Sequence, residues 1–516
     1  MTPSRAVAIA SFALALAVPL SAQTFRAPDP VIRRIWSLGM DSSQVARLAQ
    51  VLDDSIGMRL SGTWGYQSAV EWAMGMYRSW GITARQEQYG TTRGWRMGPV
   101  SAALLAPHVQ TLEVQLLAFS PGTGNRPVEG EAVVVPVGVT DSAAATRWIS
   151  STRGKFVLVS APEIMCRAPQ ELERYARPAT VQNITAQRQA AQREFASRTA
   201  LFGNQAQLAR RLQDAGAAAV VTTNWSGGWG VNKIFGSNTD RIPSIDLSCE
   251  HYGMIFRLAS NNQGPRVRLT ADAEARPDQP MFNVVAELRG SQLPNEYVLL
   301  SAHLDSWHGA NGATDNGIGT VMMMEAMRIL KQAYPNPRRT ILVGHWGGEE
   351  QGLRGSSGFR EMHPDVIAGM QVVFNQDNGT WRAELIEGQG FLGAGANLAQ
   401  WLSYVPTEIS SNLKLDVPGN QENAGSDHSA FICRGVPAFR FQANYTEYRQ
   451  YTWHTNRDTY DKVVIDDLKN NATLAAMMAY RAAEDPTRVP RDQAILPPGA
   501  SGQPRNWPSC PPAASR

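Results

Sequence analysis

Three short, strongly apolar runs in the second half of the chain set the pattern of buried and exposed positions. They occupy residues 297–302, 339–346 and 370–374, and a helical pattern at 317–333 separates the first two. Apolar runs of this length are typical of strands that are buried on both faces, and their alternation with helices indicates parallel pairing. We therefore predict an α/β domain with a doubly wound, largely parallel (mixed) sheet flanked by helices.

The pattern differs before residue 273. Residues 42–80 are helical with a break at 57–65, and short alternating stretches follow. Brief β-branched runs then surround a polar stretch at 169–214, which predicts one or two long helices packed against a β-rich module. The resulting domain prediction is a signal peptide at 1–22, an N-terminal part of the main domain at 23–120, a β-rich insert at 121–272, a second part of the main domain at 273–485 and an extended Pro-rich tail at 486–516.

The start of the chain has the features of a secretory signal peptide. Arg5 precedes an apolar stretch at residues 6–18, and small residues precede a cleavage point between Ala22 and Gln23. The apolar stretch is shorter than the roughly 20 residues that span a bilayer, which argues against a membrane anchor and against stable membrane insertion. The sequence thus predicts a secreted or periplasmic protein.

Charge and composition narrow the function further. The 48 basic and 45 acidic residues nearly balance, and no run of five or six Lys or Arg occurs, so nucleic acid is excluded as a partner. In an oxidising compartment the four cysteines can form disulfides, and the sequence leaves all three complete pairings open. These cysteines are Cys166, Cys249, Cys433 and Cys510.

Acidic and histidine residues follow all three predicted strands. His303 and Asp305 end the first strand, Glu349 and Glu350 follow the second, and Asp377 follows the third. Because the carboxyl ends of parallel strands meet at one edge of a sheet, these side chains should gather in one crevice. Such a cluster of buried acids is costly unless cations compensate its charge.

Two further residues complete a candidate metal site. Asp315 precedes the helix at 317–333, where it is either a helix N-cap or a ligand, and His454 lies in a later loop. Imidazole mixed with carboxylate favours zinc over magnesium or calcium. Two histidines and several acids suffice for two metal ions that share one bridging carboxylate, which indicates a two-metal hydrolase.

The combination of motifs resembles the co-catalytic dizinc exopeptidases of metallopeptidase family 28 over about residues 280–483, and the β-rich insert resembles a protease-associated domain. The motifs that carry the resemblance are His303-x-Asp305, Gly312-Ala-Thr-Asp315-Asn-Gly, Glu349-Glu350, Asp377-Asn-Gly, Ser426-Asp427-His428 and His454-Thr-x-x-Asp458-Thr-x-Asp461-Lys462-Val463. By position, the resemblance implies that His303 and Asp377 bind one zinc ion, that Glu350 and His454 bind the other, and that Asp315 bridges the two.

The resemblance also implies roles outside the metal ligands. Glu349 would be the general base, and Asp305 would orient the imidazole of His303 or tune Glu349. Asp427 and His428 are candidates for the substrate pocket, although His428 could instead donate to the developing oxyanion or hold a loop.

Two positions depart from many family members. His308 stands where an acid is common, and Trp453 stands immediately before His454. An indole can donate but not accept a hydrogen bond, so the tyrosine hydroxyl that some relatives contribute there is missing. The sequence therefore leaves the oxyanion donor open.

Taken together, the sequence predicts a zinc-dependent exopeptidase that releases amino acids from short peptides, with two zinc ions per chain. It leaves open whether the enzyme is an aminopeptidase, a carboxypeptidase or a dipeptidase. A single-zinc glutaminyl cyclase and a non-catalytic receptor-like ectodomain are the alternatives, and the full ligand set with Glu349 argues against both. The insert either covers the cleft or mediates a homodimer, and its position before the metal-bearing strands favours the first.

Overall fold

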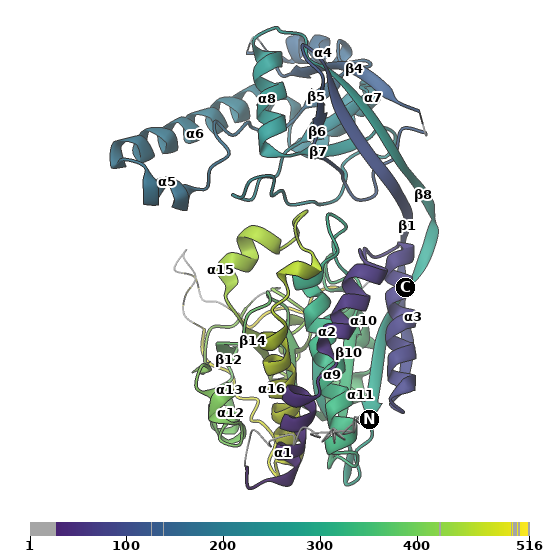
Figure 1. Ribbon diagram of the computed structural model, residues 1–516, viewed down its shortest axis with the longest axis vertical. Coiled ribbons are helices and arrows are strands. Elements are labelled where there is room, and N and C mark those ends of the chain that lie inside the picture. Colours follow the sequence, from purple (N-terminus) through teal and green to yellow (C-terminus); the bar gives the residue numbers. More distant parts are fainter. Residues whose placement is uncertain are drawn as a thin grey trace, which may run out of the picture.

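The computed structural model describes residues 27–496, 498, 503 and 506–513, except 125, 138, 423 and 424. The predicted signal peptide at 1–22 lies outside the described residues. Figure 1 shows two bodies stacked along the long axis of the molecule, joined along one side by the long strands β1 and β8. Within the part of the chain that is described, no helix is long and apolar enough to cross a membrane.

The lower body is built on a mixed sheet, as predicted. Strand β9 pairs in parallel with both β10 and β11, and β11 pairs in parallel with β14, whereas β8 and β12 join antiparallel. Every residue of β10 and β11 is buried, because helices cover both faces of the sheet. The order across the sheet is β13 (Lys414–Asp416), β12 (Leu385–Glu387), β14 (Ala438–Gln442), β11 (Met370–Gln376), β9 (Leu293–His303), β10 (Arg339–Trp346), β8 (Arg266–Leu288) and β1 (Thr83–Ala106).

Helix α9 (Ile318–Ala333) is the central helix of this body. It is buried continuously from Ile318 to Leu330 and packs against β9 and against α16 (Ile465–Glu484). Its buried residues are mostly apolar, including the run Met322 to Met324, and its two buried charges, Glu325 and Arg328, form an ion pair at 2.7 Å. The other helices are α1 (Pro30–Trp36), α2 (Val45–Gln50), α3 (Trp64–Ser79), α10 (Arg354–Met362), α11 (Pro364–Gly369), α12 (Ala394–Leu402), α13 (Thr407–Ser410), α14 (Ser429–Ile432) and α15 (Tyr445–Glu447).

The upper body contains the segment predicted as a β-rich insert at 121–272 together with residues 110–116, and it has a core of its own. Its short strands and helices pack around buried residues such as Phe156, Leu158 and Tyr252. The elements are β2 (Gln110–Leu112), β3 (Val114–Leu116), β4 (Val128–Val134), α4 (Ser142–Ser150), β5 (Phe156–Leu158), α5 (Pro169–Tyr175), α6 (Pro178–Thr199), α7 (Gln205–Ala215), β6 (Ala219–Thr222), β7 (Ser244–Leu247) and α8 (Cys249–Ser260).

The polar stretch was predicted to form one or two long helices packed against the insert, and helix α6 makes few contacts with it. None of its 22 residues is buried, and Figure 1 shows it projecting from the side of the insert. Its Gln, Arg and Ala residues form no apolar stripe, so the helix has no face to bury.

The ribbon formed by β1 and β8 is longer than the short strands predicted from the sequence. The two strands pair antiparallel from Thr83 with Glu287 to Ala106 with Arg266, with four register shifts. The lower part of the ribbon completes the sheet of the lower body, and the upper part leads into the insert, where β8 pairs with β4. The two bodies are therefore joined by continuous strands.

Two disulfides select one of the three open cysteine pairings. Cys166 pairs with Cys249 inside the insert, and Cys433 pairs with Cys510. The second bond ties the C-terminal tail to the main domain directly after α14.

Candidate metal centre

Five of the predicted residues meet at the carboxyl ends of the strands. Their candidate ligand atoms form two groups, and within each group all atoms lie within 4.8 Å of one another. The first group is His303, Asp315 and Asp377, and the second is Asp315, Glu350 and His454. Asp315 belongs to both groups, so the arrangement has the form of two adjacent cation sites with a shared carboxylate.

The distances show how Asp315 divides between the groups. In the first group, His303 Nε2 lies 3.1 Å from Asp377 Oδ1 and 3.4 Å from Asp315 Oδ1. In the second, His454 Nε2 lies 2.8 Å from Glu350 Oε2 and 3.3 Å from Asp315 Oδ2. Each oxygen of one carboxylate therefore faces a different group, as a bridging ligand requires.

The donor set fits divalent cations. Asp315 Oδ2 and Glu350 Oε1 are buried and make no hydrogen bond to any described residue. Burial, reinforced by the charge of Asp315, raises the pKa of Glu350 well above its ordinary value. Buried carboxylate oxygens without donors are costly, and cations remove that cost; the mixture of imidazole and carboxylate suits zinc.

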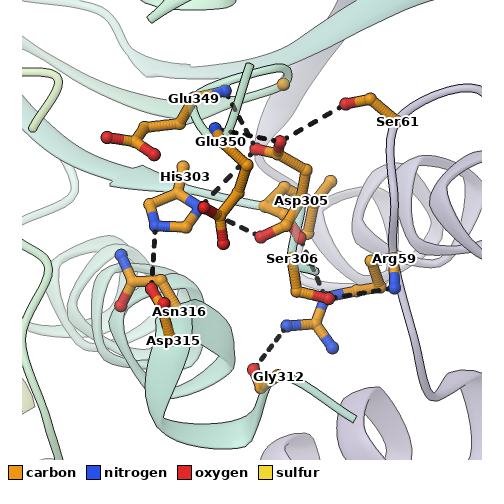
Figure 2. Close-up of polar contacts among 12 residues, drawn as sticks. Arg59, Ser61, His303, Asp305, Ser306, Gly312, Asp315, Asn316, Glu349 and Glu350 are labelled. Carbon is orange, nitrogen blue, oxygen red and sulfur yellow. Dashed lines mark hydrogen bonds and ion pairs between the residues drawn. The ribbon is translucent and has the colours of Figure 1, made fainter. Parts of the chain in front are cut away.

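Asp305 supports the site from behind its ligands. The backbone N–H groups of Glu349 and Glu350 donate to its carboxylate at 3.2 and 3.4 Å, and the Ser61 hydroxyl donates to it at 3.3 Å (Figure 2). Its backbone carbonyl accepts a hydrogen bond from His303 Nδ1 at 2.9 Å. Because a carbonyl only accepts, that bond places the proton on Nδ1 and leaves Nε2 free for a metal.

Arg59 is a positioning residue that the sequence did not reveal. Its fully buried guanidinium donates to the carbonyls of Leu304, Asn311 and Gly312 at 2.7–2.8 Å, which fixes the loop between β9 and Asp315 (Figure 2). The residue lies in the predicted helix break, about 245 positions before that loop, and no local pattern links the two segments.

Asp458 orients the shared carboxylate. Its side chain accepts hydrogen bonds from the backbone N–H groups of Thr314 at 2.8 Å and Asp315 at 2.9 Å. Both residues belong to the π-helical turn η4 (Ala313–Gly317), so Asp458 holds the turn that carries the bridge.

Tyr448 places a hydroxyl at the centre that the sequence analysis did not identify. It begins the turn η5 (Tyr448–Thr452), is only 4% exposed, and its hydroxyl is hydrogen-bonded to Asp315. Burial, followed by the charge of Asp315, raises the pKa of Tyr448 well above its ordinary value. The group is therefore a protonated donor at neutral pH, six residues before His454.

Glu349 lies beside both ligand groups but belongs to neither. Burial raises the pKa of its carboxyl group, Asp377 and Asp427 add to the effect, and His303 opposes it. With two of the ligands it lines a cavity of about 1090 Å³, which is large enough for a short peptide. An acid beside the metal sites that also faces this cavity is placed to move a proton.

Asp427 and His428, expected at the substrate pocket, lie instead in the interior. Both are fully buried, and neither lines the cavity. His428 Nε2 lies 3.1 Å from Glu422, which also forms an ion pair with Arg440; Arg440 in turn donates to the backbone carbonyl of Asp377 at 3.2 Å. This arrangement agrees with the loop-holding alternative for His428.

The insert touches the metal centre through one loop. The N–H of Ile234 donates to the carbonyl of His454 at 2.8 Å, and the ring of Phe235 packs edge-on against the His454 ring at 5.3 Å and against Trp307. His308 marks a second contact, because its Nε2 donates to the carbonyl of Leu116 in β3 at 2.6 Å. It therefore serves the junction between the two bodies.

A mixed α/β sheet that gathers imidazole and carboxylate at the ends of its parallel strands defines a class of metal-dependent hydrolases. Residues 283–479 of the chain match the model described as Peptidase family M28. It is 28% identical over 448 residues to carboxypeptidase Q of Homo sapiens, and the match covers 86% of each chain.

Solved structures show the same fold over nearly the whole chain. A peptidase M28 precursor from Shewanella amazonensis superposes with a TM-score of 0.63 at 22% identity and covers 89% of this chain and 97% of its own. A zinc aminopeptidase from Bacillus subtilis superposes with a TM-score of 0.57 at 18% identity, with coverages of 87% and 97%.

Proposed function

We propose that this protein is an exported zinc-dependent exopeptidase that binds two zinc ions and removes terminal residues from short peptides. The observation that carries the proposal is the division of the Asp315 carboxylate between two ligand groups, with Glu349 beside them. The names of the relatives, a carboxypeptidase and a zinc aminopeptidase, both describe exopeptidases. Export is supported by the signal-peptide pattern and by the two disulfides.

His303 and Asp377 would hold one zinc ion, Glu350 and His454 the other, and Asp315 both. Bound zinc supplies Lewis-acid chemistry, which lowers the pKa of a water molecule and polarises the scissile carbonyl.

The side chains of this chain would then direct the proton. Glu349 takes it from the attacking water and passes it to the leaving amine, as a general base and then a general acid. Asp305 keeps Glu349 and Glu350 in place through their backbone N–H groups.

Tyr448 is the candidate for the oxyanion donor that the sequence left open. Its protonated hydroxyl belongs to a buried side chain and lies at the candidate bridging carboxylate. A donor fixed in a buried site stabilises negative charge that develops in the transition state without reorganising.

The experiment that tests the proposal combines peptide digestion with metal analysis. Wild-type protein and Glu349→Gln are incubated with a library of short peptides, with and without 1,10-phenanthroline, and the products are read by mass. Wild-type protein should release single terminal residues only without the chelator, and the terminus released defines the specificity. Glu349→Gln should lose about a thousandfold in turnover, because general base catalysis contributes about 10²–10⁴-fold, yet keep its zinc.

The matched control is Glu384→Gln, which changes an exposed acid of the same domain and should keep full activity. Undiminished turnover by Glu349→Gln would contradict the mechanism. One zinc ion per wild-type chain, with no peptide cleavage, would instead favour the single-zinc cyclase.

A further inference from the structure

We infer that the C-terminal segment 506–513 forms one wall of the substrate cavity and limits the length of the peptides that enter. The inference rests on the proposed function and adds to it a specificity-determining element outside the ligand set. The tail was predicted only to be an extended surface segment, yet its end reaches the candidate active site.

The cavity of about 1090 Å³ has two sides. One side carries the candidate base and two metal ligands together with the turn that follows β10. The other side is formed by consecutive residues of the tail. The lining residues of the first side include Glu349, Glu350, Arg354, Ser429 and His454, and those of the second are Asn506, Trp507, Pro508, Ser509, Cys510, Pro511, Pro512 and Ala513.

Four contacts fasten the tail along this wall. Cys510 is bonded to Cys433, and the Trp507 indole donates to the carbonyl of Ile432 at 2.8 Å. Arg360 donates to the carbonyl of Pro511 at 2.8 Å, and the Trp507 ring packs edge-on against Phe391 at 5.4 Å. A covalent bond with contacts on both sides of it holds a short segment at a fixed place.

The composition of the segment suits a rigid, neutral wall. Three of its eight residues are proline, which restricts the backbone, and none carries a charge. Such a wall neither attracts nor repels the terminal charges of a peptide, and it acts by occupying space. A peptide whose reacting bond lies at Glu349 can therefore extend only a short distance before it meets the tail.

The disulfide also connects the wall to the support of the metal centre. Cys433 directly follows α14, whose N-terminal neighbours are Asp427 and His428. Loss of this bond frees the wall and leaves the first metal group in place, because the ligands come from other elements.

The test uses the full chain and two variants that release the wall. One variant ends at Gln503, and the other replaces Cys433 and Cys510 by Ser. The control replaces Cys166 and Cys249 by Ser, which removes the disulfide of the insert. For each protein, kcat/KM is measured for a tripeptide and for an octapeptide with the same terminal sequence, and thermal melting and zinc content verify the fold.

A second readout does not depend on peptide cleavage. The rate at which the chelator 4-(2-pyridylazo)resorcinol withdraws zinc reports how accessible the cavity is from solvent. Trp507→Ala is measured as well, so that a failure of the larger changes to fold still leaves a variant that loosens the wall.

Both wall variants should raise the octapeptide-to-tripeptide ratio of kcat/KM at least tenfold and speed zinc withdrawal several-fold, and the control should change neither. A ratio within twofold of wild type in a folded, zinc-loaded wall variant would overturn the inference. If the wild-type protein cleaves neither peptide, the proposed function fails. The rates of zinc withdrawal then decide the inference alone, and equal rates for wild type and the wall variants overturn it.

Discussion

The carboxylate of Asp315 is the residue on which the two halves of the metal centre depend. Its oxygens face different imidazoles, and the Asp458 carboxylate accepts hydrogen bonds from its backbone N–H and from that of Thr314. The hydroxyl of Tyr448 is hydrogen-bonded to the same carboxylate. The bridge is thus fixed from the backbone and from a side chain, which preorganises the site before any ion binds.

Tyr448→Phe tests the oxyanion role at the residue scale. Removal of one fixed donor should lower kcat about a hundredfold to a thousandfold, because such donors act on the transition state. KM and zinc content should stay within about twofold of wild type, since the ring keeps its packing. The measurement is steady-state kinetics with metal analysis.

Tyr445→Phe is the matched control, because Tyr445 lies in the same loop with 44% of its surface exposed. Equal activity of Tyr448→Phe and Tyr445→Phe would show that Tyr448 stabilises no developing charge.

His303, Glu350 and Asp377 could be predicted as candidate ligands because each stands at or just after the end of an apolar run. Asp315 and His454 lie outside the strands and became candidates through the motifs around them. Arg59 and Tyr448 could not be predicted in this way. Arg59 acts on a loop about 245 positions later, and Tyr448 is one of three tyrosines within seven residues. Only the folded chain shows which of them turns inward.

At the scale of single elements, the strand β7 of the insert carries a buried acid that belongs to neither candidate ligand group. Asp246 accepts hydrogen bonds from Thr222 at 2.8 Å and from Asn232 at 2.5 Å. Burial nevertheless raises its pKa to about 7. Asn232 also binds Asn456 near His454, so this acid supports the loop through which the insert meets the metal centre.

The raised pKa of Asp246 predicts a pH dependence of stability. A carboxyl group whose pKa is higher in the folded state stabilises that state fully below its unfolded pKa of about 3.9, and the contribution is lost as the pH rises to about 7. The shift corresponds to about 4 kcal/mol. When the pH rises from 4 to 8, the free energy of unfolding of wild type should therefore fall by a few kcal/mol relative to that of Asp246→Asn.

Urea unfolding of both proteins at the two pH values measures this difference. Asp278→Asn, which changes an exposed acid, should show a constant difference. A constant difference for Asp246→Asn would mean that the carboxyl group titrates normally in the fold.

Other elements show why part of the fold escaped prediction. The ribbon of β1 and β8 is largely exposed as it crosses between the bodies, so its sequence lacks the apolar alternation that marks a half-buried strand. Helix α6 has the composition of a helix but no apolar face, so its helical pattern was predictable and its projection from the insert was not.

At the scale of the whole molecule, the two bodies are connected in several places. The ribbon joins them covalently along one side, and the loop with Ile234 and Phe235 contacts the metal centre on its own. The position of His454 therefore depends on a segment of the insert more than 200 residues earlier in the chain. The insert is part of the catalytic unit in this account.

Phe235→Ala tests this dependence. Loss of the ring that packs on His454 should weaken zinc binding and lower kcat/KM, each about tenfold or more, as for other groups that orient a ligand. Trp229→Ala, at a site that is 65% exposed in the same loop, should leave both unchanged. Zinc affinity is measured by titration against a competing chelator, and kcat/KM by steady-state kinetics. Wild-type values of both for Phe235→Ala would show that the metal centre does not depend on the insert.

The central claim is that one carboxylate joins two cation sites at the carboxyl ends of the sheet. Anomalous diffraction at the zinc edge, from crystals of the zinc-loaded protein, tests it most directly. The account predicts two peaks about 3.5–4 Å apart, one held by His303 and Asp377, the other by Glu350 and His454, with Asp315 bound to both. A single peak, or peaks held by other residues, would contradict it.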